Sequence, residues 1–195
     1  MSHCSCVRTD YRDGMLICSY AKHWLMLIEQ STDCPVDYDR SKSLYERVQK
    51  KLISEEDEHQ IELDVPRTFP EEPFFGEGNT QGRQTLKVIL KTLCKHSSSA
   101  GYTQGMNFIV ATLLFHCGEV LAFEMTIRAL NDYALKAVYM SKLPGLYFHC
   151  EVIQALMKEE LPELVVHFKN KIDLMVVCQT WIMCIFTQVI PLNQV

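Results

Sequence analysis

The side chain best suited to chemistry on a phosphate group is an arginine in a loop bounded by prolines. Arg67 lies between Pro66 and Pro70 in the segment IELDVPRTFP, residues 61–70, directly after a predicted helix. An arginine keeps its charge, and its fork of N–H donors can bind two phosphate oxygens at once. Arg67 can therefore stabilise negative charge that develops during phosphoryl transfer, and Asp64 can orient its guanidinium through a hydrogen bond.

A second segment, GYTQGMNF at residues 101–108, carries a glutamine at the start of a predicted apolar helix. Gln104 lies between Gly101 and Gly105, and glycines let the backbone approach a bulky partner closely. A primary amide both donates and accepts hydrogen bonds. Gln104 can therefore hold a water molecule in line for attack on a phosphoryl group.

Each of these residues alone also has an ordinary structural explanation. An arginine after a helix end commonly offsets the helix dipole or forms a surface ion pair. A glutamine at a helix start is commonly a solvated residue of the cap. The loop residues Phe69, Phe74 and Phe75 are expected to anchor the loop on the core. Only the joint occurrence of the two segments favours a catalytic role for Arg67 and Gln104.

Other common catalytic and binding motifs are missing from the sequence. It has no GxxxxGK[ST] phosphate-binding loop, no HExxH metal site and no GxSxG nucleophile turn. Its nine cysteines are scattered without a CxxC pair, which predicts reduced thiols. A zinc site at His3, Cys4 and Cys6 would need further ligands at a sensible spacing. We therefore expect no metal and no cofactor of the chain's own.

The elements that must position the two segments are helical, and we predict an all-α domain. Apolar residues recur at helical spacing along almost the whole chain, and no strand pattern of useful length occurs. An acidic helix over residues 55–63, capped by Ser54, ends before Pro66, and its run EEDE is expected to face solvent. A loop over residues 67–82 follows, and the glutamine segment opens an apolar helix that ends at Cys117. Other helices are predicted over residues 17–28, 44–52, 86–93, 119–135, 145–159, 162–168 and 174–190.

Composition restricts the partners. The chain has 195 residues, about one domain, with a net charge of −5 and a pI near 5.8, so it has no basic footprint for nucleic acid or anionic lipid. Residues 174–190 carry no charge, but Gln179, Thr180, Thr187 and Gln188 would share one helix face. We therefore expect a buried helix there rather than a transmembrane segment. The polar N-terminus and scattered thiols predict a cytoplasmic protein.

Together, the IxxDxxRTFP and GYxQGMNF segments resemble the two catalytic motifs of the TBC-domain family, whose members are all-helical activators of Rab-type small GTPases. The resemblance extends over residues 12–192 and includes Pro144-Gly145-Leu146, Leu161-Pro162-Glu163-Leu164, Trp181 and Phe186. It differs at Leu93-Cys94, where the family usually has an aromatic residue.

The resemblance implies a single all-α domain over residues 1–195. Residues 12–130 would form an N-terminal part with both motifs, and residues 131–195 the start of a C-terminal helical part. The family continues beyond the helix of Trp181 with a Trp-Asp signature, so the sequence predicts a domain truncated at its C-terminus.

The resemblance also implies a function. The chain would be a GTPase-activating protein, not an enzyme on its own, that supplies Arg67 as an arginine finger and Gln104 as a glutamine finger. The partner would be a Rab-type small GTPase that carries GTP and Mg²⁺, with a role in vesicle trafficking and recruitment to endomembranes through that partner. Residues expected to brace the loops or contact the partner are Asp64, Thr68, Tyr102, Gly105 and Asn107. Two alternatives are an interaction module of the same fold without catalytic effect, and a helical scaffold unrelated to GTPases.

Overall fold

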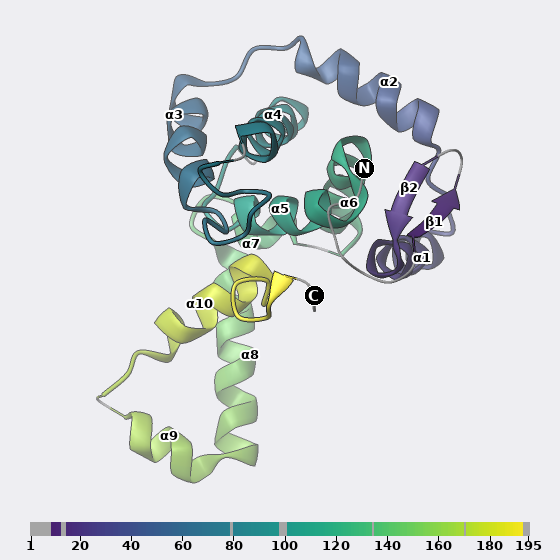
Figure 1. The fold of residues 1–195 in the computed structure, drawn as a ribbon. Coiled ribbons are helices and arrows are strands. Elements are labelled where there is room, and N and C mark those ends of the chain that lie inside the picture. Colours follow the sequence, from purple (N-terminus) through teal and green to yellow (C-terminus); the bar gives the residue numbers. More distant parts are fainter. Residues whose placement is uncertain are drawn as a thin grey trace.

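The computed structural model describes residues 9–12, 15–78, 80–97, 101–133, 135–169 and 171–192, with side chains described from Cys18 onward. Helices dominate this part of the chain, so the all-α prediction is confirmed (Figure 1). The elements, in chain order, are β1 (Thr9–Arg12), β2 (Met15–Cys18), α1 (Ser19–Thr32), α2 (Tyr38–Gln49), α3 (Glu55–Asp64), the 3₁₀ turn η1 (Val65–Arg67), α4 (Thr80–His96), α5 (Met106–Cys117), α6 (Glu119–Asp132), α7 (Lys136–Tyr139), α8 (Pro144–Glu160), α9 (Pro162–Phe168) and α10 (Leu174–Cys184).

Helix α5 forms the centre of the core. All of its twelve residues except Phe108 are buried, which is what an almost wholly apolar helix requires. It contacts α1, α4, α6 and α10, so helices from both ends of the described chain pack on it. The glutamine segment, residues 101–108, runs into the first turn of α5 and is thereby attached to a helix whose residues are almost all buried.

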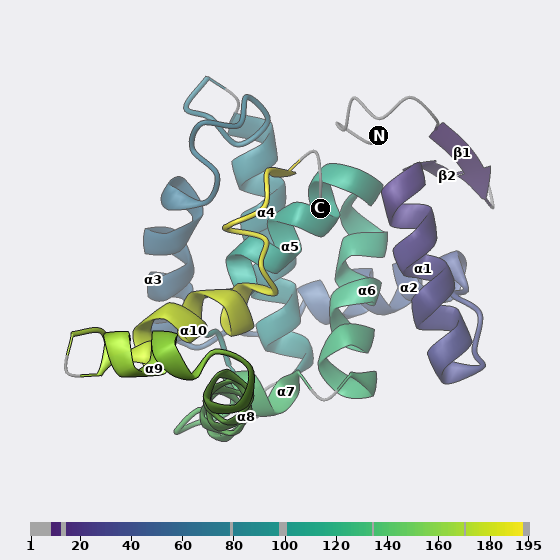
Figure 2. The same ribbon diagram turned by 90° about the horizontal axis from the view of Figure 1, so that it is seen from below.

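Helices α8 and α9 extend away from the bundle that α1–α6 form. Figure 1 shows α8 running outward, α9 at its far end and α10 returning towards the bundle. Seen from below, α10 lies across the underside of the core near α5 (Figure 2), and it contacts both α5 and α8. Helix α10 thus connects the outer part of the molecule to the core. None of the described helices has the length and apolar composition to cross a bilayer.

The sequence prediction of no useful strand missed a short antiparallel hairpin. Strands β1 and β2 pair from Thr9 opposite Cys18 to Arg12 opposite Met15. The predicted first helix therefore starts at Ser19 rather than at Ile17. Each strand has four residues, too few for an alternating pattern to be recognised.

Several predicted helix boundaries were also wrong, including the start of α2, at Tyr38 rather than residue 44, and the end of α6, at Asp132 rather than residue 135. Helix α2 ends at Gln49, and Leu52 lies beyond it with 95% of its surface exposed. Helix α10 ends at Cys184 because Ile185 and Phe186 adopt left-handed backbone conformations, with φ of 47° and 60°. The face predicted to carry Gln179, Thr180, Thr187 and Gln188 is therefore not continuous. Residue Gly82, which we placed in the loop, lies inside α4.

Candidate functional site

Arg67 and Asp64 form an ion pair across one turn of chain. Helix α3 ends at Asp64, and η1 then carries Arg67 out to the surface. The arginine side chain is 55% exposed, whereas that of Asp64 is 1% exposed. One guanidinium nitrogen, Nη2, donates to Oδ1 of Asp64. A buried carboxylate requires such a partner. The ion pair with Asp64 therefore fixes the orientation of a guanidinium group that is otherwise exposed.

The second oxygen of Asp64 connects this turn to the glutamine segment. The hydroxyl of Tyr102 donates to Oδ2 of Asp64 at 2.6 Å. Burial, together with this hydrogen bond to a carboxylate, raises the pKa of Tyr102 far above its usual range. Tyr102 therefore remains protonated and keeps donating. The carboxylate of Asp64 is bound on one side by the arginine and on the other by the tyrosine.

A second bridge joins the same two segments, through Thr68 and Asn107. The Thr68 hydroxyl donates to the carbonyl oxygen of Asp64 at 2.7 Å and accepts a hydrogen bond from Nδ2 of Asn107 at 2.8 Å. Oδ1 of Asn107 accepts from the backbone N–H of Gly105 at 3.0 Å. All four residues are buried, so each of these polar groups is satisfied within the protein.

Gln104 is exposed, although Gly105, the next residue, is buried. Gly105, which follows it, has φ of +111°, and a Cβ there would lie 2.9 Å from the carbonyl oxygen of Met183 in α10. Only glycine fits this conformation and this contact. Within the described residues, the Gln104 side chain forms no hydrogen bond, so its amide is available to a partner.

Two residues that support the site were not identified from the sequence. Asp57 belongs to the run expected to face solvent, but its Oδ1 accepts from the backbone N–H of Tyr102 at 2.6 Å, and its Oδ2 accepts from the Ser54 hydroxyl at 2.7 Å. Arg83 donates from Nε to the carbonyl oxygen of Phe75 at 2.5 Å and from Nη2 to that of Pro66 at 3.3 Å. The prediction of a solvated run is thus wrong for Asp57. No pattern in the sequence pairs either residue with these distant carbonyl or amide groups.

The loop after Arg67 is anchored as the sequence predicts. Phe74 and Phe75 are buried, and the rings of Phe69 and Phe108 meet edge to face with centroids 5.2 Å apart. Beside this loop, Arg67 and Phe69 line an open pocket of about 530 Å³, whose far wall comes from α10 and the chain after it. The arginine is therefore at the edge of a surface hollow that a partner can enter.

In the described part of the chain, no three His, Cys, Asp or Glu side chains are grouped as metal ligands would be. Among the described cysteines, Cys34, Cys94, Cys117, Cys150, Cys178 and Cys184 are free thiols. The predicted absence of a zinc site at His3, Cys4 and Cys6 concerns residues outside the described part.

Residues 18–195 match the model of the Rab-GTPase-TBC domain family. The chain is 31% identical over 158 residues to the Rab GTPase-activating protein eat-17 of Caenorhabditis elegans, and 31% identical over 133 residues to the human ecotropic viral integration site 5 protein homolog. These alignments cover 80% and 68% of the chain but only 16% of each relative.

Two solved structures share the fold. The Ypt/Rab-GAP domain of Gyp1p superposes with a TM-score of 0.70 at 20% identity, over 85% of this chain and 63% of that one. The Chlamydomonas flagellar RabGAP TBC domain superposes with a TM-score of 0.67 at 22% identity, over 89% and 56%. From the match along almost its whole length, the chain belongs to the Rab-GTPase-TBC domain family.

Proposed function

We propose that the chain accelerates GTP hydrolysis by a Rab-type small GTPase and supplies Arg67 and Gln104 in trans. The observation that supports this most is the pair of side-chain hydrogen bonds that join the loop of the arginine to the loop of the glutamine, one part-buried at 2.6 Å and one buried at 2.8 Å. These bridges keep two exposed polar side chains on adjoining loops. A relative that is named a Rab GTPase-activating protein supports the same proposal.

In this proposal the arginine contributes electrostatic stabilisation. Negative charge spreads over the γ-phosphoryl oxygens as the bond to the leaving group breaks, and a positioned guanidinium lowers the energy of that state. The ion pair with Asp64 uses Nη2 of Arg67 and leaves the other N–H donors for phosphate oxygens. The side chain is oriented before the partner binds, so little further ordering is needed at the moment of reaction.

The glutamine contributes the position of the attacking water. Its amide would accept a hydrogen bond from the water and donate one to the partner, as the GTPase's own glutamine would otherwise do. The rigid setting of Gly105 against α10 fixes the direction in which Gln104 leaves the surface. GTP and Mg²⁺ would be carried by the partner, and the chain would act in the cytoplasm or at endomembranes where that partner resides.

The direct test is single-turnover GTP hydrolysis by a panel of Rab-type GTPases with and without the chain. We expect stimulation of at least one GTPase, and a loss of roughly 10³-fold or more of that stimulation in Arg67→Ala. Arg67→Lys should restore little of the stimulation, because an ammonium group cannot bind two phosphate oxygens at once as the planar guanidinium does. Lys50→Ala, at an exposed residue beyond α2, is the matched control and should behave as the wild type.

Binding of a GTPase without any stimulation by the wild-type chain would contradict the proposal and favour the interaction module. Failure to bind any GTPase would favour a helical scaffold.

A further inference from the structure

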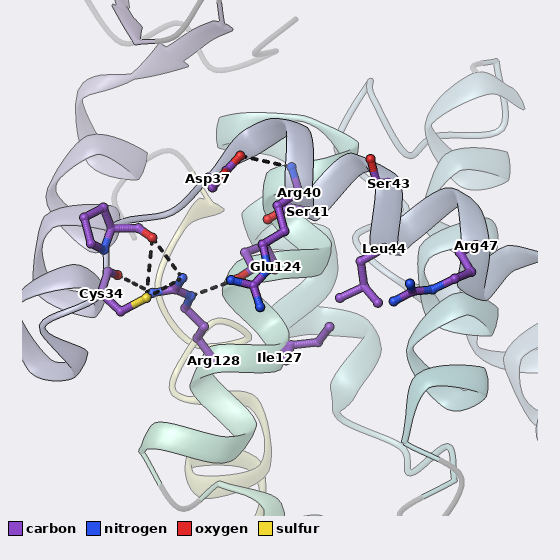
Figure 3. A pocket seen from close by; sticks show the side chains of 11 residues that line it. Cys34, Asp37, Arg40, Ser41, Ser43, Leu44, Arg47, Glu124, Ile127 and Arg128 are labelled. Atoms are coloured by element: carbon purple, nitrogen blue, oxygen red, sulfur yellow. Dashed lines mark hydrogen bonds and ion pairs between the residues drawn. The ribbon is translucent and has the colours of Figure 1, made fainter.

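A separate pocket lies between α2, α6 and the chain that connects α1 to α2 (Figure 3). Its volume is about 520 Å³, within the range of small-molecule sites. It shares no lining residue with the hollow beside Arg67. A ligand in this pocket would therefore occupy a different site from the GTP of the partner GTPase in the proposed function.

Two arginines of α2 line this pocket without a counter-ion. Arg40 and Arg47 are seven residues apart, two helical turns and about 10.5 Å along the axis, so they lie on one side of α2. Figure 3 shows them on either side of Leu44, with Ile127 of α6 opposite. Both arginines are exposed, and among the described residues neither forms an ion pair. Their charge is thus available to a ligand.

The third arginine of the pocket has a different role. Arg128 donates from Nε to Oε1 of Glu124 at 2.8 Å, from Nη1 to the carbonyl oxygen of Cys34 at 2.7 Å, and from Nη2 to that of Pro35 at 3.3 Å. Its charge is compensated by Glu124, and its side chain forms one wall of the pocket by binding the connection between α1 and α2.

The carboxylate of Asp37 is also engaged, because it caps α2 by accepting a hydrogen bond from the backbone N–H of residue 40.

The charge around the pocket differs from that of the chain. The pocket lining carries three arginines against two carboxylates, Asp37 and Glu124, a surplus of one positive charge, whereas the whole chain has a net charge of −5. A local positive potential over a concave surface attracts anions. Leu44 and Ile127 supply an apolar floor between the two guanidinium groups, which suits the carbon face of a ring.

We propose that this pocket binds a small ring compound that carries two phosphate groups, a phosphorylated sugar or cyclitol. Arg40 binds one phosphate and Arg47 the other, and the ring lies over Leu44 and Ile127. Arginine suits this role because its planar fork matches phosphate oxygens in pairs. The compound is either free in solution or the headgroup of a membrane lipid, since the two present the same chemistry to the pocket.

The probes are soluble inositol trisphosphate, followed by calorimetric titration, and vesicles of phosphatidylcholine with or without phosphatidylinositol bisphosphate, followed by co-sedimentation. The variants are Arg40→Gln and Arg47→Gln. The matched control is Lys42→Gln, because Lys42 is an exposed basic residue of the same helix that does not line the pocket. All three substitutions lie on the surface, and circular dichroism checks that the fold is retained.

We expect inositol trisphosphate to bind the wild-type chain, each arginine variant to bind it at least about tenfold more weakly, and Lys42→Gln to bind it as the wild type does. Arg67→Ala should bind it normally, which separates this site from the proposed catalytic one. Recruitment to bisphosphate vesicles as well would identify a lipid headgroup, and binding of the soluble compound alone would identify a free solute. No binding, an equal loss in Lys42→Gln, or equally tight binding of an oligoglutamate peptide would overturn the proposal.

Discussion

At the scale of single residues, the site depends on how one buried carboxylate is shared. Asp64 accepts from the exposed Arg67 on one oxygen and from the half-buried Tyr102 on the other. A carboxylate this deeply buried is stable only with both partners present. Under the proposed function, Asp64 is a positioning residue: it acts on the reaction only through the guanidinium that it orients.

Asp64→Asn tests this role. The amide keeps the shape of the carboxylate and can still accept from Tyr102, but it loses the charge that holds Arg67. We expect the rate constant for stimulated hydrolysis at saturation to fall by roughly 10- to 100-fold, the cost of a charged hydrogen bond, with little change in the affinity for the GTPase. Stopped-flow hydrolysis over a range of chain concentrations separates the two quantities. A weakened affinity with an unchanged saturating rate would show that Asp64 does not position the arginine.

The sequence predicted most of the residues that brace the two loops: Asp64, Thr68, Tyr102 and Asn107 are joined by hydrogen bonds. Arg67 and Gln104 are exposed, as residues of the two predicted loop segments should be, and their catalytic role stays a prediction. Asp57 could not be found in this way, because an acidic run at the start of a helix is explained fully by the helix dipole. Its bond to the backbone of Tyr102 joins residues 45 positions apart, and only the tertiary fold brings them together.

At the scale of elements, the arginine loop is packed against α4 through a glycine. A Cβ on Gly82 would lie 2.0 Å from the carbonyl oxygen of Phe74, a backbone atom that cannot move without moving the loop. This close approach explains a glycine in the first turns of a helix, where it is otherwise unfavourable. The same contact explains why a loop rich in glycine and proline is held in one conformation.

We expect Gly82→Ala to lower the free energy of unfolding by at least about 2 kcal/mol despite the better helix propensity of alanine, because the clash involves backbone. The matched control is Gly78→Ala in the same loop, where a Cβ would meet nothing within 4 Å. That substitution should be neutral or slightly stabilising. Urea denaturation of both variants measures the difference. Equal stabilities would mean that the loop is not packed against α4 in this way.

The ends of elements were the least predictable feature. Apolar spacing alone would continue α10 to residue 190, and α2 to Leu52. The chain instead turns after Cys184 because Ile185 and Phe186 are held in left-handed conformations, which only tertiary packing can impose on such side chains. Propensity and periodicity describe what a segment prefers in isolation, and these two ends are decided by contacts with the rest of the fold.

At the scale of the whole molecule, one histidine connects the two ends of the described chain. His116 of α5 is fully buried, and its Nε2 lies 3.0 Å from the carbonyl oxygen of Leu192. A carbonyl only accepts, so Nε2 carries the proton and Nδ1 accepts from the Cys18 thiol at 3.1 Å. Burial lowers the pKa of His116 below its usual value. The fold therefore requires the neutral imidazole.

Because the unfolded chain binds a proton at His116 at higher pH than the folded chain does, stability should be complete above about pH 6.5 and decline as the pH falls below it. The contribution of this one group is at most about 1.4 kcal/mol per pH unit. Urea denaturation between about pH 7.5 and 5.5 measures the slope. His116→Gln should be less stable but should show a smaller slope than the wild type. An identical slope in both proteins would assign the pH dependence to other groups.

Helices α8 and α9 carry large apolar side chains at the surface. Tyr147, Phe148, Leu156 and Val166 are between 54% and 73% exposed. Contiguous exposed apolar residues favour association. We expect the 195-residue chain to self-associate as its concentration rises, and the double variant Phe148→Ser/Val166→Ser to reduce this. Analytical ultracentrifugation measures it, and a monomer at every concentration would contradict the expectation.

The central claim is that two side chains of this chain complete the active site of a GTPase. The most direct measurement is single-turnover GTP hydrolysis with four pairings: the wild-type chain or Gln104→Ala, each with a wild-type GTPase or with one whose own catalytic glutamine is replaced. We predict that the wild-type chain stimulates both GTPases and that Gln104→Ala stimulates neither appreciably. Loss of stimulation whenever the GTPase lacks its own glutamine, with Gln104→Ala fully active on the wild-type GTPase, would contradict the account and leave the arginine as the only group supplied.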